Sequence, residues 1–97
     1  STIYCDLNNS IKKTDIINLF KDLQKVNPFI KYIDNDETLD FFSIQNSNYC
    51  KIKIFDHYSE DKLIIVSAID NLIKGAAGQA VQCFNIAENI EETLSLV

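Results

Sequence analysis

Few side chains of this chain are of types that do chemistry, and they stand far apart in the sequence. The only histidine, His57, lies in a polar run beside Tyr58, Glu60 and Asp61. An imidazole there can serve as a general base, but the local sequence assigns it no serine or cysteine constellation. Because hairpin loops of this composition are exposed, a solvated loop histidine is the competing interpretation.

The cysteines and the acidic run do not form a recognisable metal site. Cys5, Cys50 and Cys83 are odd in number and lack the spacing of zinc ligands, so we expect reduced, buried thiols. The acidic segment of residues 34–40 lacks the glycine and the glutamate that a calcium-binding loop requires at its sixth and twelfth positions. This segment therefore predicts a solvated loop, and we expect no bound metal.

Residues 70–87 (DNLIKGAAGQAVQCFNIA) hold both glycines of the chain, Gly75 and Gly78. Each costs a helix interior about 0.5–1 kcal/mol relative to alanine, so close packing against this surface is expected. The spacing matches neither a dinucleotide-binding G-x-G-x-x-G nor a P-loop. It resembles the G-x-x-G loop of KH domains, but only Lys74 is basic nearby, which argues against binding of an RNA backbone.

Composition limits the function classes. The 97 residues fit one domain, and 46% apolar with 24% charged residues is typical of a globular chain. A net charge of −5 argues against nucleic acid or an anionic membrane as partner. No apolar run reaches the roughly 18–20 residues that span a bilayer, and no signal peptide is recognisable. Since the sequence starts without methionine and directly in a strand-like run, we expect a fragment, or a processed or trimmed chain. The reduced thiols predict a cytoplasmic protein.

Hydrophobic periodicity predicts the elements of the first half. Ser1–Leu7 is expected to be a strand, and Lys12–Asn27 a helix with Thr14 as its N-cap and one apolar face. Pro28 ends this helix. Phe29–Ile33 then alternates as a strand does.

Strand patterns dominate the second half. Phe41–Ile44 predicts a short strand or an extended link, and Tyr49–Asp56 alternates cleanly. Lys62–Ile69 is apolar almost throughout, which predicts a central strand covered on both sides. Asp70 is expected to cap a helix over residues 70–87.

That helix carries apolar side chains on two neighbouring faces, which predicts burial on more than one side. The two sets are Leu72, Ala76, Ala80, Cys83 and Ala87, and Ile73, Ala77, Val81 and Phe84. The element order predicts an α+β fold: an antiparallel or mixed sheet of about four strands with helices packed on one face.

The run Ser67–Asn85 (SAIDNLIKGAAGQAVQCFN) resembles the C-terminal segment of N-acetyl-gamma-glutamyl-phosphate reductases of arginine biosynthesis. Ser47–Val66, Asn27–Ile33 and the initial STIYCDL resemble other segments of that family, so the resemblance covers essentially the whole chain. Aspartate-semialdehyde dehydrogenases, which share an Asn-Leu-x-x-Gly-Ala-Ala run, and lysine-pathway reductases are similar to a lesser degree. A non-catalytic structural or interaction module is the alternative from another class.

The resemblance implies a homo-oligomeric, NADP-dependent enzyme that reduces a small-molecule acyl phosphate to a semialdehyde through a nucleophilic cysteine. It implies that residues 1–97 belong to a C-terminal catalytic and dimerisation domain like that of glyceraldehyde-3-phosphate dehydrogenase. The family's nucleophile, catalytic histidine and nucleotide-binding domain match segments N-terminal to this chain. None of its three cysteines is therefore expected to be catalytic, and the chain alone is expected to be inactive.

Site residues implied by the resemblance lie in the glycine-containing helix. Asn71 matches the family asparagine near the nicotinamide carboxamide, although a helix-start asparagine that satisfies backbone groups is the alternative. Gly75 and Gly78 match positions where the helix passes close to the cofactor or catalytic domain, and close packing without ligand contact is the alternative. For Lys74, a ligand role and a solvated surface lysine both remain open.

Two further expectations follow from the resemblance. Ser47 and Asn48 match a pair near the family's site, but Gln45 and Asn46 stand where the family has Arg-Gly. The helix of residues 70–87 is expected to contact the nucleotide-binding domain. Within this chain, its second apolar set (Ile73, Ala77, Val81 and Phe84) should therefore be exposed, or buried by a second copy.

Overall fold

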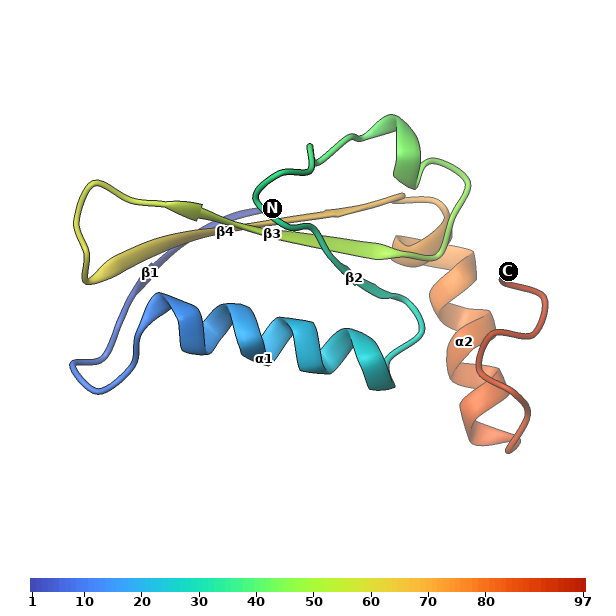
Figure 1. Ribbon diagram of the computed structural model, residues 1–97. Helices are drawn as coiled ribbons and strands as arrows, with labels where there is room; N and C mark the ends of the chain where they lie inside the picture. The colour runs from blue at the N-terminus through green and yellow to red at the C-terminus, as the bar shows by residue number, and fades with distance from the viewer.

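A computed structural model describes residues 1–97 as a four-stranded mixed sheet with two longer helices (Figure 1). The strands are β1 (Thr2–Asp6), β2 (Ile30–Tyr32), β3 (Cys50–Asp56) and β4 (Lys62–Ile69). The helices are α1 (Lys13–Val26) and α2 (Gly78–Ala87), with a short 3₁₀ helix, η1 (Phe42–Ile44), and a π-helical turn, η2 (Ile73–Ala77). The predicted α+β class and mixed sheet are confirmed.

The strand order is β1-β4-β3-β2, with β4 antiparallel to both neighbours and β2 parallel to β3. β1 and β2 thus lie at opposite edges and run in the same direction. The helix α1, which joins them, crosses one face of the sheet, whereas residues 33–49 pass over the other face (Figure 1). The helix α2 lies beyond the end of the sheet rather than on a face (Figure 1).

The core lies between α1 and the sheet. It is built from Tyr32, Ile54 and Leu63. Apolar side chains from α1, from β1 and the residue after it, and from β4 pack against these three: Cys5, Leu7, Ile16, Ile17, Phe20 and Ile65. The N-cap of α1 is Lys12, two residues before Thr14, and the backbone N–H of Lys12 donates to Oδ2 of Asp15 at 2.8 Å. Thr14 as the N-cap is therefore wrong.

Residues 41–44 form a helical turn, so the expected strand or extended link there is wrong. Oδ1 of Asp40 accepts the backbone N–H of Phe42 at 2.9 Å, and the Ser43 hydroxyl donates to the Asp40 carbonyl at 2.8 Å. Such short-range side-chain bonds give the backbone an alternative to strand pairing.

The sheet face opposite α1 is only partly covered, so the expected burial of β4 on both sides is wrong for this chain. Tyr4, Ile64 and Phe55 lie side by side on β1, β4 and β3, and Val66 follows on β4. Tyr4 is 73% and Phe55 41% exposed. We call these four residues the open sheet face.

The thiols are free and less buried than expected. Cys83 is exposed, whereas Cys5 and Cys50 are half-buried. Burial raises the pKa of the Cys50 thiol, although the nearby Lys74 ammonium acts in the opposite direction. No helix combines the length and the apolar character needed to cross a membrane.

Candidate functional site

The segment that follows β4 is fixed by the carboxylate of Asp70. Its Oδ1 accepts the backbone N–H groups of Leu72 at 2.8 Å and Ile73 at 3.2 Å, and its Oδ2 accepts that of Asn46 at 2.8 Å. The bond from Asn46 and the two from the helix start lower the pKa of the Asp70 carboxyl. Asp70 thus caps the helical segment, as predicted, and ties it to the loop before β3.

A widened turn separates Asp70 from α2. The N–H of Gly75 donates to the Asp70 carbonyl at 3.1 Å, and the N–H of Ala77 donates to the Leu72 carbonyl at 3.3 Å. Both bonds span five residues, the spacing of a π-helix, and such turns are frequent at functional sites. The structure therefore divides the single helix expected over residues 70–87 into a π turn and α2.

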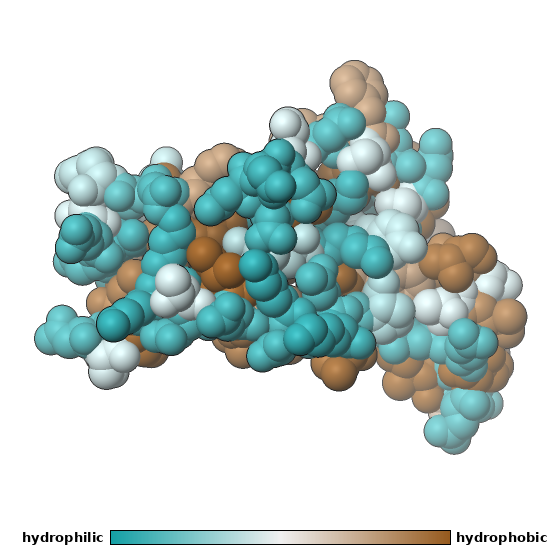
Figure 2. Space-filling model, in the orientation of Figure 1, coloured by the Kyte–Doolittle hydropathy of each residue, from teal (hydrophilic) through white to brown (hydrophobic).

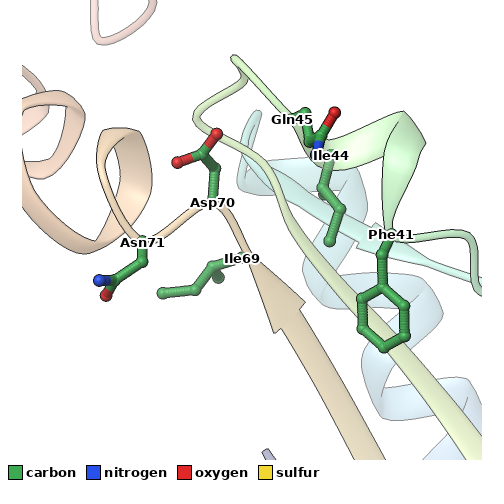
Figure 3. A pocket seen from close by; sticks show the side chains of 6 residues that line it. All are labelled: Phe41, Ile44, Gln45, Ile69, Asp70 and Asn71. Carbon is green, nitrogen blue, oxygen red and sulfur yellow. The ribbon is translucent and has the colours of Figure 1, made fainter.

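Asn71 lies on this turn with its side chain exposed and without a hydrogen bond inside the chain. Figure 3 shows it beside the side chain of Ile69, at the end of β4. A Cβ atom on Gly75 would lie 3.0 Å from Oδ1 of Asn71 and 3.4 Å from Cδ1 of Ile69. Glycine at position 75 therefore leaves room for the amide of Asn71.

A shallow pocket of about 290 Å³ adjoins Asn71 (Figure 3). Its walls are the apolar side chains of Phe41, Ile44 and Ile69, together with Gln45, Asp70 and Asn71. Of the predicted cofactor residues, the structure thus brings Asn71 and Gly75 together at the end of the central strand.

Gly78 lies in a different environment. It is buried, and a Cβ atom there would lie 2.2 Å from Oδ1 of Asn48 and 2.7 Å from the carbonyl oxygen of Ile73. The Asn48 side chain is itself only 1% exposed, and its Oδ1 has no hydrogen-bond donor. Gly78 therefore allows α2 to approach the loop before β3, which matches the close-packing alternative for this glycine.

Hydrogen bonds of the Gln82 side chain connect Asn48 to the π turn and to the C-terminal segment. Oε1 of Gln82 accepts bonds from Nδ2 of Asn48 at 2.9 Å and from Nζ of Lys74 at 2.6 Å, while its Nε2 donates to Oε1 of Glu92 at 2.7 Å. We call Asn48, Lys74, Gln82 and Glu92 the Gln82 network. Sequence reasoning missed Gln82, whose only local signal is a position outside both apolar sets of the helix.

The helix α2 has its polar side inward. Its buried residues are Gly78, Gln82 and Asn85, whereas Phe84 is 59% exposed. The predicted burial of two apolar faces is wrong for this chain: Ala77, Val81 and Phe84 are exposed and Ile73 is half-buried, which is one of the two outcomes expected for this set. Figure 2 shows apolar surface gathered over this end of the molecule.

The loop before β3 explains part of the departure from the family pattern. Asn46 adopts a φ of 59°, the left-handed region that glycine occupies most easily and asparagine tolerates. Asn46 can therefore replace the family glycine, whereas Gln45 supplies no charge in place of the arginine.

The remaining candidate groups are not brought into a site. Nδ1 of His57 accepts the backbone N–H of Ser59 at 3.0 Å, and its ring lies next to that of Tyr58. No group of three histidine, cysteine, aspartate or glutamate side chains is arranged to hold a metal ion. The structure thus shows no catalytic arrangement around His57.

Comparison with known proteins identifies the family. A profile described as semialdehyde dehydrogenase, dimerisation domain, matches residues 1–71. An N-acetyl-gamma-glutamyl-phosphate reductase of Brachyspira hyodysenteriae is 44% identical over 95% of this chain and 26% of its own length. Proteins of the same name from Methanosphaera stadtmanae and Staphylococcus saprophyticus are 41% and 38% identical, over 93% and 100% of this chain.

The chain spans only about a quarter of the length of these relatives, at 26–28%. The profile nevertheless covers most of the chain, and the matched relatives carry the name of the family that the sequence resembles. The resemblance is therefore confirmed: this chain belongs to the semialdehyde dehydrogenase family, of which it carries the dimerisation domain.

Proposed function

We propose that this chain is the C-terminal part of an NADP-dependent N-acetyl-gamma-glutamyl-phosphate reductase, a cytoplasmic enzyme of arginine biosynthesis that reduces an acyl phosphate to a semialdehyde. The observation that carries the proposal is the unpaired amide of Asn71 beside Gly75, at the end of the central strand. The names of relatives at 38–44% identity support the substrate class.

The residues around Asn71 fit the nicotinamide end of the cofactor. The exposed amide of Asn71 offers both a donor and an acceptor, which a carboxamide can pair with in complementary fashion. Ile69 supplies apolar surface next to it, and Gly75 keeps the space free of a side chain. NADPH supplies the hydride when bound. In this proposal Asn71 orients the carboxamide, and Gly78 acts indirectly by letting α2 pack on Asn48.

The exposed apolar side of α2 fits a contact with the nucleotide-binding domain. Leu72, Val81, Phe84 and Ile86 are all exposed, and an apolar surface of this kind marks an interaction site. We propose that residues 70–87 contact that domain. The 97-residue chain alone should then be inactive, because the family's nucleophile and nucleotide-binding domain match segments outside it.

In the full-length reductase, Asn71→Ala should raise the KM for NADPH at least about tenfold, the effect of losing roughly 1.4 kcal/mol of binding. Asn18→Ala, on the exposed side of α1, is the matched control and should leave KM unchanged. Steady-state kinetics with N-acetyl-glutamyl phosphate and with aspartyl phosphate would also distinguish the two related activities. An unchanged KM in the Asn71 variant, or activity of the 97-residue chain alone, contradicts the proposal.

We further propose that a second copy covers the open sheet face, as suits a dimerisation domain. A charge placed in the centre of an apolar interface is strongly unfavourable, so Tyr4→Asp should weaken dimerisation at least about a hundredfold. Sedimentation equilibrium of the chain measures this. Val26→Asp, at a residue 77% exposed on α1, introduces the same charge on another surface and should dimerise normally. Equal dimerisation of both variants places the interface elsewhere.

A further inference from the structure

Three lysines on the β2–β3 side of the sheet have no carboxylate partner. Lys31 and Lys51 are in register across the two parallel strands, and Lys53 follows on the same side of β3. By contrast, four other lysines each form an ion pair with an aspartate: Lys13, Lys21, Lys25 and Lys62. Like charges directly opposite each other destabilise a sheet, so an anion bound between Lys31 and Lys51 would stabilise this one.

Lys53 adds a buried positive charge next to this pair, although it does not line the pocket described below. Its side chain is only 7% exposed, and its ammonium donates to the backbone carbonyl of Glu37 and lies 5.5 Å from the centre of the Phe55 ring. Buried charges in proteins are normally paired with an opposite charge. For the Lys53 ammonium, the chain provides only the dipole of the Glu37 carbonyl and the ring of Phe55, although the whole chain carries a net charge of −5.

A pocket of about 350 Å³ opens at this cluster, between β2, β3 and the segment that crosses over them. Lys31 and Lys51 line it together with the hydroxyl-bearing Ser43 and Tyr49. Nζ of Lys51 donates to Oγ of Ser43 at 2.5 Å, and Nζ of Lys31 lies 5.1 Å from the centre of the Tyr49 ring. Two lysines without a carboxylate partner thus line one space, and the Ser43 hydroxyl, which donates to the Asp40 carbonyl, holds Lys51 at its edge.

We propose that this pocket binds a small oxyanion, namely the phosphate or carboxylate group of a metabolite. The Lys31 and Lys51 ammonium groups are donors that such anions accept, and charge-assisted bonds of this kind are strong. Glu37, the only carboxylate in the wall, is exposed and can turn towards solvent. The pocket shares no residue with the one beside Asn71, so this site is independent of the proposed cofactor contact.

The test is a titration of the ¹⁵N-labelled 97-residue chain with inorganic phosphate, and separately with citrate, at constant ionic strength. We expect saturable amide shifts at Lys31, Ser43 and Lys51, with millimolar affinity for at least one of the two anions. Phosphate alone identifies a phosphate group as the ligand, and citrate alone a carboxylate.

Lys31→Gln and Lys51→Gln should each weaken binding at least fivefold. The matched control is Lys12→Gln, which removes another unpaired lysine, remote from the pocket, and should leave the affinity unchanged. Because Lys31 lies on an edge strand, its variant tests the proposal even if the Lys51 variant does not fold. Shifts that do not saturate, that chloride reproduces, or that survive both substitutions overturn the proposal.

Discussion

Gly78→Ala is expected to lower the free energy of unfolding by about 2–3 kcal/mol, the upper range for forcing extra atoms into a packed interior. The added methyl group would overlap Oδ1 of Asn48 and the carbonyl oxygen of Ile73. The Ile73 carbonyl belongs to the backbone of the π turn, so rotating a side chain cannot relieve that contact. Urea unfolding followed by far-UV circular dichroism measures the loss.

Gly75→Ala is the matched control, because it adds the same methyl group three residues earlier. Its Cβ would meet only the ends of the Asn71 and Ile69 side chains, at 3.0 and 3.4 Å. Asn71 is exposed and can rotate away, and alanine favours a helix by about 1 kcal/mol over glycine. Stability should stay equal or rise, whereas NADPH binding by the full-length protein should weaken. Equal losses of stability at both glycines would refute the packing argument.

Asn48→Asp should destabilise the chain by about 2–3 kcal/mol at pH 7, because the Lys74 ammonium, which donates to the same Gln82 oxygen as Asn48, offsets only part of the cost of burying the charge. The new carboxylate would lie against the Gln82 carbonyl oxygen, which accepts the bond from Asn48 in the native chain. Burial raises the pKa of the introduced carboxyl group above its unfolded value near 4, so its charged form is disfavoured only in the folded state. The penalty is therefore full above the folded pKa and disappears below about pH 4.

The control for this substitution is Asn48→Leu, which has the same branching at Cγ and no charge. Gln82 keeps its bond from Lys74, and the unsatisfied oxygen of Asn48 is removed, so the loss should stay below about 2 kcal/mol and be independent of pH. Urea titrations at pH 7 and pH 4 separate the two variants. A pH-independent loss in the Asp variant would mean that position 48 is hydrated.

The strands and α1 could be predicted because their signals are local. Alternation in Tyr49–Asp56 and helical spacing in Lys12–Asn27 each reflect contact with one core, which this chain contains. The bounds of α1 agree with the prediction to within one residue, but the cap does not, because the side chain of Asp15, not that of Thr14, makes the capping bond. Residues 41–44 were misjudged because bonds from Asp40 and Ser43 outweigh their apolar character.

The candidate site was only partly predictable for a different reason. Asn71 and Gly75 could be proposed as site residues through the family resemblance, since they lie in one continuous motif. The contact between Asn48 and Gln82 joins residues 34 positions apart, and nothing in either local sequence indicates the other. The exposure of Phe84 was expected only through the family resemblance, and that of Tyr4 was not expected, because an apolar pattern shows that a surface is to be covered and not whether the cover belongs to the same chain.

The inward polar side of α2 means that one helix serves two tasks with separate residues. Gly78 and Gln82 hold the helix against Asn48 in the loop before β3, and Asn85 holds the C-terminal segment through the Glu92 and Leu94 carbonyls. Any association depends on the outward Val81, Phe84 and Ile86. Substitutions at the outward positions can therefore change how tightly this helix associates without changing the fold of the domain. In the isolated chain, the fold therefore constrains the polar positions of this helix more than its apolar positions, which is the opposite of the usual pattern.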